Sequence, residues 1–147
     1  MRHYAARFAS GRQSVRAARH AVKTFATACG LSEAAIDDVV VAAGEAVANA
    51  IEHGRSLGLF SVECRFVDGT LTVEVTDEGR GFASWDKVQE ARRGFIVGAA
   101  PGATPLRGFG IKIMYELMDE VTYHDGGRRV RLVKHRGVAK SETTGTA

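Results

Sequence analysis

Glu45 and Asn49 are the polar side chains whose spacing is best suited to chemistry, since they lie four residues apart in an alanine-rich stretch. Residues at i and i+4 share one face of an α-helix, so a carboxylate and a carboxamide would lie side by side. A carboxylate accepts a proton, and a carboxamide oxygen is a ligand for a hard cation. The same pattern is common on ordinary solvated helix faces. The pair therefore becomes informative only together with other motifs.

A second candidate is the segment Asp77-Glu-Gly-Arg-Gly81, which directly follows an alternating apolar run. An aspartate held at the end of a strand accepts a hydrogen bond from an exocyclic amine such as that of adenine. Gly79 and Gly81 allow positive φ and let the backbone lie close to a flat ligand. Alone, this motif is weak evidence, because most such segments are ordinary turns.

Gly108 and Gly110 form a third motif, immediately before an apolar-periodic run that predicts a helix over Ile111–Met118. Backbone N–H groups at the start of a helix bind anions, so this glycine pair suits a polyphosphate. Residues 83–107, between the second and third motifs, lose their periodicity apart from one short helix expected over 85–93. Their glycines and prolines predict a lid that closes over the phosphates.

The first motif is carried by a predicted helix that begins after Ser32, its expected N-cap, and ends at Gly54. Five apolar residues repeat at helical spacing and predict its buried stripe: Ile36, Val40, Ala43, Val47 and Ile51. Glu45 and Asn49 are expected on roughly the opposite face.

The remaining periodicity predicts one more helix and five strands. The helix, over residues 12–28, is expected to be capped by Ser10 and ended by Gly30. Asp68-Gly69 and the glycines after Asp125 are turn signals. The strands are expected over residues 2–9, 59–67, 71–76, 121–124 and 130–134. This order predicts an α/β protein, a two-layer sandwich with a mixed, mostly antiparallel sheet and helices on one face.

The composition is that of one globular domain, since 45% of the 147 residues are hydrophobic and 25% are charged. We expect this domain to span residues 1–136 and residues 137–147 to form a disordered tail. No apolar run approaches the ~20 residues of a membrane-spanning helix, and no secretory signal is recognised. Cys29 and Cys64 are too few for a disulfide framework, which predicts buried, reduced thiols in the cytoplasm. P-loop, dinucleotide-binding and eukaryotic-type kinase signatures are absent from the sequence.

The net charge of +3 is unevenly distributed, because the first acidic residue is Glu33. The cations before it are Arg2, Arg7, Arg12, Arg16, Arg19 and Lys23. We interpret this basic surface as a docking face for an acidic protein partner. A plain solvated face, a nucleic-acid patch and an organelle transit peptide are the alternatives.

In this order and spacing, the three motifs resemble the N, G1 and G2 boxes of the GHKL ATPase superfamily, which includes gyrase, Hsp90, histidine kinases and MutL. Within it, three segments are similar to the bacterial anti-sigma factor serine kinases: residues 45–54 (EAVANAIEHG), 77–82 (DEGRGF) and 107–111 (RGFGI). The resemblance covers roughly residues 1–135 and implies the GHKL, or Bergerat-type, ATP-binding fold. Phe109 replaces a frequent leucine, which alters packing and leaves the glycines in place.

The resemblance also implies a role for each matching residue. Asn49 is expected to ligate Mg²⁺ on the phosphates of ATP, and Glu45 to act as the general base toward a serine hydroxyl. Asp77 is expected to hold the adenine amino group. The other expected cofactor-binding residues are Gly79 and Gly81 around the base, and Arg107, Gly108, Gly110, Ile111 and Lys112 near the phosphates. His53, at the end of the helix, is expected to be structural.

By this resemblance, the protein is a cytoplasmic regulator that sequesters a sigma factor and phosphorylates a serine of an anti-anti-sigma partner of the STAS type. The resemblance further implies a homodimer, with no direct contact to nucleic acid or membrane. Two alternatives stay open. One is a nucleotide-binding partner-switching regulator without significant kinase activity, and the other is a stress-relay kinase of a STAS protein without a sigma target.

Overall fold

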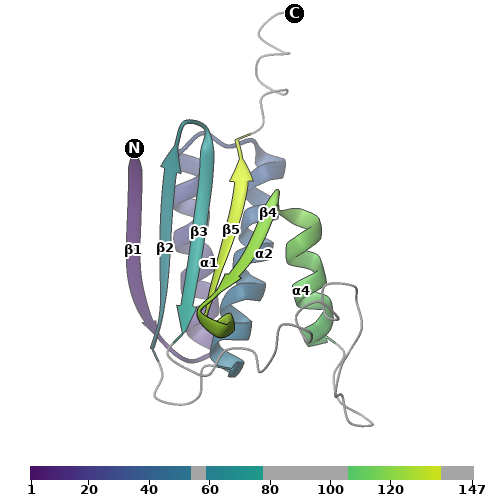
Figure 1. Cartoon of the computed structure of the whole chain (residues 1–147). Helices are drawn as coiled ribbons and strands as arrows, with labels where there is room; N and C mark the ends of the chain where they lie inside the picture. Colours follow the sequence, from purple (N-terminus) through teal and green to yellow (C-terminus); the bar gives the residue numbers. More distant parts are fainter. Residues whose placement is uncertain (54–58, 78–105, 137–147) are drawn as a thin grey trace, which may run out of the picture.

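The computed structural model describes residues 1–53, 59–77 and 106–136. Its elements are β1 (Arg2–Ala9), α1 (Arg12–Ala28), α2 (Glu33–His53), β2 (Leu59–Val67), β3 (Thr70–Asp77), α4 (Leu106–Leu117), β4 (Glu120–His124), the 3₁₀ turn η1 (Asp125–Gly127) and β5 (Arg129–His135). The strands form one sheet in the order β1-β2-β3-β5-β4. Helices α1 and α2 cover one face of this sheet, and α4 lies beside β4 (Figure 1). The expected two-layer α/β fold is confirmed.

Every pairing between the described strands is antiparallel, which agrees with the expected mixed, mostly antiparallel sheet except that no parallel pair occurs among these strands. The β2–β3 hairpin turns at Asp68 and Gly69, whose φ values are both positive, at 49° and 78°, as a two-residue type I′ turn requires. The β4–β5 hairpin turns through the longer η1 segment. Because β3 pairs with β5, Thr76 lies opposite Arg129, and the end of β3 is brought to the start of β5.

The predicted end of α1 is confirmed in detail. Gly30 has a φ of +79°, and its N–H donates to the carbonyl of Thr27 at 3.0 Å. The N–H of Leu31 donates to the carbonyl of Ala26 at 3.4 Å. These two bonds define a Schellman motif, in which glycine is favoured because L-residues with a side chain are strained at positive φ.

The two helix starts differ in how well they were predicted. Ser32 caps α2 as expected, because its Oγ accepts the N–H of Ala35 at 3.1 Å. Ser10 does not cap α1, which begins at Arg12 and therefore has Gly11 at its N-cap, with no side-chain hydrogen bond. Ser10 lies one residue too early to reach the first free N–H groups.

The buried face of α2 is turned relative to our prediction. Ala43 and Val47 are buried as expected, but Ile36, Val40 and Ile51 are only half-buried. The other buried residues of the helix include Ala35, Val39, Ala42, Ala46 and Ala50. The reason is that α2 packs against α1 and α4 as well as the sheet, so small residues occupy the closest contacts. Glu45 and Asn49 consequently flank the buried face and do not lie opposite it.

Helix α4 begins at Leu106, five residues earlier than predicted. Gly108 and Gly110 therefore lie inside the helix and not before it. Glycine disfavours a helix interior by about 1 kcal/mol, which the packing of α4 against α2 offsets. The short helix expected over 85–93, the expected lid up to residue 105 and the expected tail lie outside the described residues.

The core lies between the sheet and the helices, with alternate residues of β2 and β3 facing inward. Cys29 and Cys64 are both buried and not bonded to each other, and burial raises the pKa of the Cys64 thiol to about 12. Within the described ranges, none of the helices is long and apolar enough to cross a membrane.

Candidate functional site

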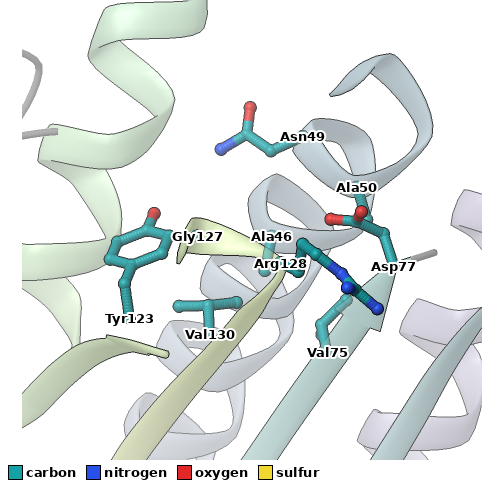
Figure 2. Close-up of a pocket in the computed structure, with 9 residues that line it drawn as sticks. All are labelled: Ala46, Asn49, Ala50, Val75, Asp77, Tyr123, Gly127, Arg128 and Val130. Atoms are coloured by element: carbon teal, nitrogen blue, oxygen red, sulfur yellow. The ribbon is translucent and has the colours of Figure 1, made fainter. Parts of the chain in front are cut away.

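Asn49 and Asp77 meet at a small pocket between the C-terminal half of α2, the end of β3 and the β4–β5 hairpin. Figure 2 shows the two side chains projecting from α2 and β3 toward the same hollow. The described residues that line it are Ala46, Asn49, Ala50, Val75, Asp77, Tyr123, Gly127, Arg128 and Val130. The first and second sequence motifs are therefore parts of one site.

Asp77 is the last residue of β3, and only 4% of it is exposed. Among the described residues, Asp77 is the one charged residue that is buried. Its N–H donates to the carbonyl of Arg128 at 2.9 Å. This hydrogen bond joins the end of β3 to the turn between β4 and β5. An ionised carboxylate only accepts hydrogen bonds, so Asp77 suits a ligand group that donates one.

The carboxamide of Asn49 includes a hydrogen-bond donor that is unsatisfied among the described residues. Its Nδ2 amide is buried and has no hydrogen-bond partner among the described residues. Leaving a buried donor unpaired costs about 1–3 kcal/mol, so this amide does not stabilise the fold. The carboxamide also offers an oxygen of the type that Mg²⁺ prefers. The residue thus fits the role of holding a metal and phosphate group.

Glu45 lies one helical turn before Asn49, half-buried and outside the set of described residues that line the pocket. Burial raises the pKa of its carboxyl above the ordinary value, and the positive charge of Arg19 opposes this rise. A raised carboxyl pKa suits a general base, because the driving force for taking a proton is then larger near neutral pH.

Gly110 provides the contact between α4 and Glu45. A Cβ at this position would overlap the Oε1 atom of Glu45, and it would lie 3.4 Å from Cδ. In a helix that begins at Leu106, the first four N–H groups lack intrahelical partners, which includes Gly108 but not Gly110. Gly108 therefore retains the geometry of an anion-binding helix start, whereas Gly110 permits close packing.

The other expected binding residues lie elsewhere or outside the described chain. Ile111 is in the core, with 3% exposure. Lys112 donates from Nζ to Oε1 of Glu116 at 2.8 Å on the surface of α4. Gly79 and Gly81 lie outside the described residues, as do the side chains of His53 and Arg107.

The β4–β5 hairpin contributes a wall of the pocket that the motifs did not predict. Tyr123 and Val130 face inward from the two strands, and Gly127 and Arg128 come from the turn between them. Burial raises the pKa of the Tyr123 hydroxyl, so it stays protonated and can donate. The inward alternation of the predicted strand over 121–124 was the available signal, but it does not show that this strand end faces Asp77.

Comparison with known proteins gives the class of the molecule. The chain matches the family of the histidine kinase-like ATPase domain over residues 8–134 and therefore belongs to it. The predicted resemblance to anti-sigma factor serine kinases is confirmed by individual relatives. An anti-sigma F factor of Clostridium botulinum is 32% identical over 133 residues, covering 86% of this chain and 90% of that protein. The serine-protein kinase RsbW of Listeria innocua is 31% identical over 121 residues, covering 80% and 76% respectively.

A solved structure supports the fold. The RsbU and RsbW domains of a Mycobacterium tuberculosis protein match with a TM-score of 0.64 at 20% identity, over 92% of this chain. This chain spans about a third (32%) of that longer chain. The likeness therefore concerns the fold of one part of it.

Proposed function

We propose that the chain is an anti-sigma factor with ATP-dependent serine kinase activity. The observation that supports this most strongly is the meeting of Asn49 and Asp77 at one pocket. The Nδ2 amide of Asn49 is buried there without a hydrogen-bond partner among the described residues, and Glu45 lies one turn away. The names of the relatives, anti-sigma F factor and serine-protein kinase, support both halves of the proposal.

In the proposed reaction, Asp77 accepts a hydrogen bond from the adenine amino group and so orients the nucleotide. Asn49 would hold Mg²⁺ through its carboxamide oxygen, and its amide would donate to a phosphate oxygen. When bound, Mg²⁺ supplies positive charge that offsets the charge of the phosphates. The carboxylate of Glu45 takes the proton of the serine hydroxyl while that oxygen receives the γ-phosphoryl group and ADP leaves.

We further propose that this activity serves a partner switch in the cytoplasm. The sigma factor would be released when a STAS-type anti-anti-sigma partner docks, and the phosphate placed on that partner would weaken its affinity by adding charge. Arg12, Arg16, Arg19 and Lys23 are exposed on α1 and form a basic surface that suits an acidic partner. A homodimer of a single domain over residues 1–136 is part of the same proposal.

A nucleotide-binding regulator without kinase activity is the second candidate. It is favoured by one observation, which is that Glu45 lies outside the described lining of the pocket. The Glu45→Gln variant separates the two candidates, because a general base contributes about 10²–10⁴-fold to the rate. The kinase proposal expects that loss in phosphorylation of the STAS partner with ATP affinity retained, and Glu33→Gln on the same helix is the control.

The first experiment is calorimetric titration of ATP, with and without Mg²⁺, into the wild type and Asp77→Asn. We expect metal-enhanced binding that Asp77→Asn weakens and that the exposed turn variant Asp68→Asn leaves unchanged. Equal affinity in all three proteins would exclude Asp77 as the adenine contact. Absence of binding to the wild type would overturn the kinase proposal.

A further inference from the structure

Strand β1 lies at the edge of the sheet opposite β4 and α4 (Figure 1). It pairs with β2 on one side, and no strand among the described residues lies on its other side. An edge of this kind presents backbone N–H and C=O groups that another strand can pair with. The eight residues of β1 include no proline, which is one of the devices that protect an edge from such pairing.

A hollow lies beside the first half of β1, between this strand and the C-terminal half of α1. Its described lining is Arg2, His3, Tyr4, Thr24, Phe25 and Ala28. Tyr4 and Phe25 are only half-buried, although both pack against the core. Phe8 lies on the same helix-facing side of β1, also half-buried, and its ring stacks on Phe60 with 5.4 Å between the ring centroids. One strand therefore carries both an aromatic ring and an aromatic-lined hollow at its edge.

The sequence of β1 complements itself in one register. A two-fold axis perpendicular to the sheet makes two identical edge strands antiparallel, and residues opposite each other must then face the same side of the sheet. Such a pairing is centred on a residue. Centred on Ala6, it places Tyr4 opposite Phe8 of the second copy and opposes no two cations. A shift of the centre by one residue in either direction opposes His3 to Arg7 or Arg7 to itself, and like charges directly opposite are destabilising.

We propose that β1 is a dimer interface, in which it pairs with β1 of a second copy about a two-fold axis at Ala6 and makes the two sheets continuous. Phe8 of each copy then covers the hollow beside Tyr4 and Phe25 of the other, which removes aromatic surface from water. This rests on the homodimer of the proposed function and specifies its interface, and it does not depend on kinase activity. An identical strand is the occupant that fits, because β1 itself carries both the ring and the hollow.

The first test is disulfide trapping of the full chain with Ala6→Cys. Opposed residues of an antiparallel pair have Cα atoms about 4.5–5.5 Å apart, a distance that a disulfide spans. The native Cys29 and Cys64 are buried and should not react. We expect Ala6→Cys to form covalent dimers under mild oxidation, and the control Ala34→Cys, at an exposed position of α2, to remain uncoupled. Equal trapping of both variants, or none of Ala6→Cys, would overturn the inference.

The second test is sedimentation of Ala5→Glu and Ala5→Lys at several concentrations. Ala5 is exposed and pairs with Glu63 of its own chain, so lysine is the better neighbour within one copy. Across the proposed interface it lies opposite Arg7 of the second copy, so glutamate is the better residue there, at two symmetric places. We therefore expect the dissociation constant of the dimer to fall about fivefold in Ala5→Glu and to rise about fivefold in Ala5→Lys.

Other outcomes separate the inference from the proposed function. Unchanged or reversed dissociation constants would overturn the β1 interface even if the wild type is a dimer. A wild type that sediments as a monomer at every concentration would overturn both the interface and the homodimer. Titration of ATP into the same proteins tests the nucleotide site by itself, and a dimer that fails to bind ATP would support the interface while overturning the kinase proposal.

Discussion

The polar groups at the two ends of α2 differ in whether they have hydrogen-bond partners. At the N-terminal end, the hydroxyl of Ser32 accepts a backbone N–H, and Asp38 Oδ2 accepts from Nζ of Lys134 at 3.0 Å. Lys134 also donates to the carbonyl of Leu117 at the end of α4. At the C-terminal end, the amide of Asn49 is buried without a described partner, and Glu45 has a raised carboxyl pKa.

The comparison separates stability from function within one helix. Paired groups at the N-terminal end fix α2 to α4 and β5. Unpaired or poorly solvated groups at the other end cost stability in the absence of ligand. Loss of a polar group at the N-terminal end should therefore lower stability, whereas loss of a polar group at the C-terminal end should not. The following predictions test this difference in stability and in function.

The largest effect is expected at the N-terminal end. Lys134→Met leaves Asp38 without its cation and the Leu117 carbonyl without a donor, and it should lower the free energy of unfolding by about 2 kcal/mol. Urea denaturation measures this. Lys112→Met is the control, because the exposed Lys112–Glu116 pair should contribute less than about 0.5 kcal/mol. Equal losses in both variants would mean that the contacts of Lys134 with Asp38 and Leu117 stabilise the fold no more than an exposed surface pair does.

Gly110→Ala should act on the other end through Glu45. Its methyl group displaces the carboxylate, so phosphoryl transfer should fall about tenfold, while the stability of the fold is maintained by the helix propensity of alanine. In a Glu45→Ala background the same substitution should leave ATP affinity unchanged, because the clashing side chain is gone. A loss of ATP affinity in that background would instead show that Gly110 contacts the phosphates.

Asn49→Ala and Ser32→Ala form a matched pair on one helix. Loss of the Ser32 cap should lower the free energy of unfolding by about 1 kcal/mol. Loss of the unpartnered Asn49 amide should leave stability without ATP unchanged or raise it by about 0.5 kcal/mol, and abolish the Mg²⁺ enhancement of ATP binding. Equal destabilisation by both variants would mean that Asn49 is a structural residue.

The smallest effect is a pH dependence of stability. Because the folded-state pKa of Glu45 is raised above its ordinary value of 4.5, the protonated carboxyl is favoured in the folded protein. Its contribution is complete below pH 4.5 and is lost as pH rises through the folded-state pKa. The stability advantage of Glu45→Gln over the wild type should therefore grow across that interval, as chemical denaturation at several pH values would show. A constant difference would contradict the raised pKa.

Local periodicity predicted the elements, but not how neighbouring elements share space. The strands and the hairpin at Asp68-Gly69 follow from alternation and turn chemistry, which depend on adjacent residues. The buried face of α2 was misplaced because three elements cover it, and the sequence pattern shows only which residues are large and apolar. The alanines that face these neighbours carry no strong hydrophobic signal.

The candidate site shows the same limit. Asn49 and Asp77 were predicted as site residues because a carboxamide and a strand-end aspartate have recognisable chemistry. The contribution of Tyr123 and Arg128 depends on the β3–β5 pairing, which joins positions some fifty residues apart in the chain. The packing role of Gly110 depends on how closely α4 approaches α2, and the sequence alone does not predict that distance.

The position of Lys134 has a consequence for motion. Its ammonium group joins α2, α4 and β5 about 16 Å along α2 from Asn49. Amide protons near the Lys134–Asp38 contact should exchange with solvent only through global unfolding, whereas those near Asn49 should exchange through local opening. Addition of ATP should then slow hydrogen exchange at the C-terminal end of α2 and leave exchange at its N-terminal end unchanged. We therefore expect the N-terminal end of α2 to stay rigid and its C-terminal end to change its mobility when nucleotide binds.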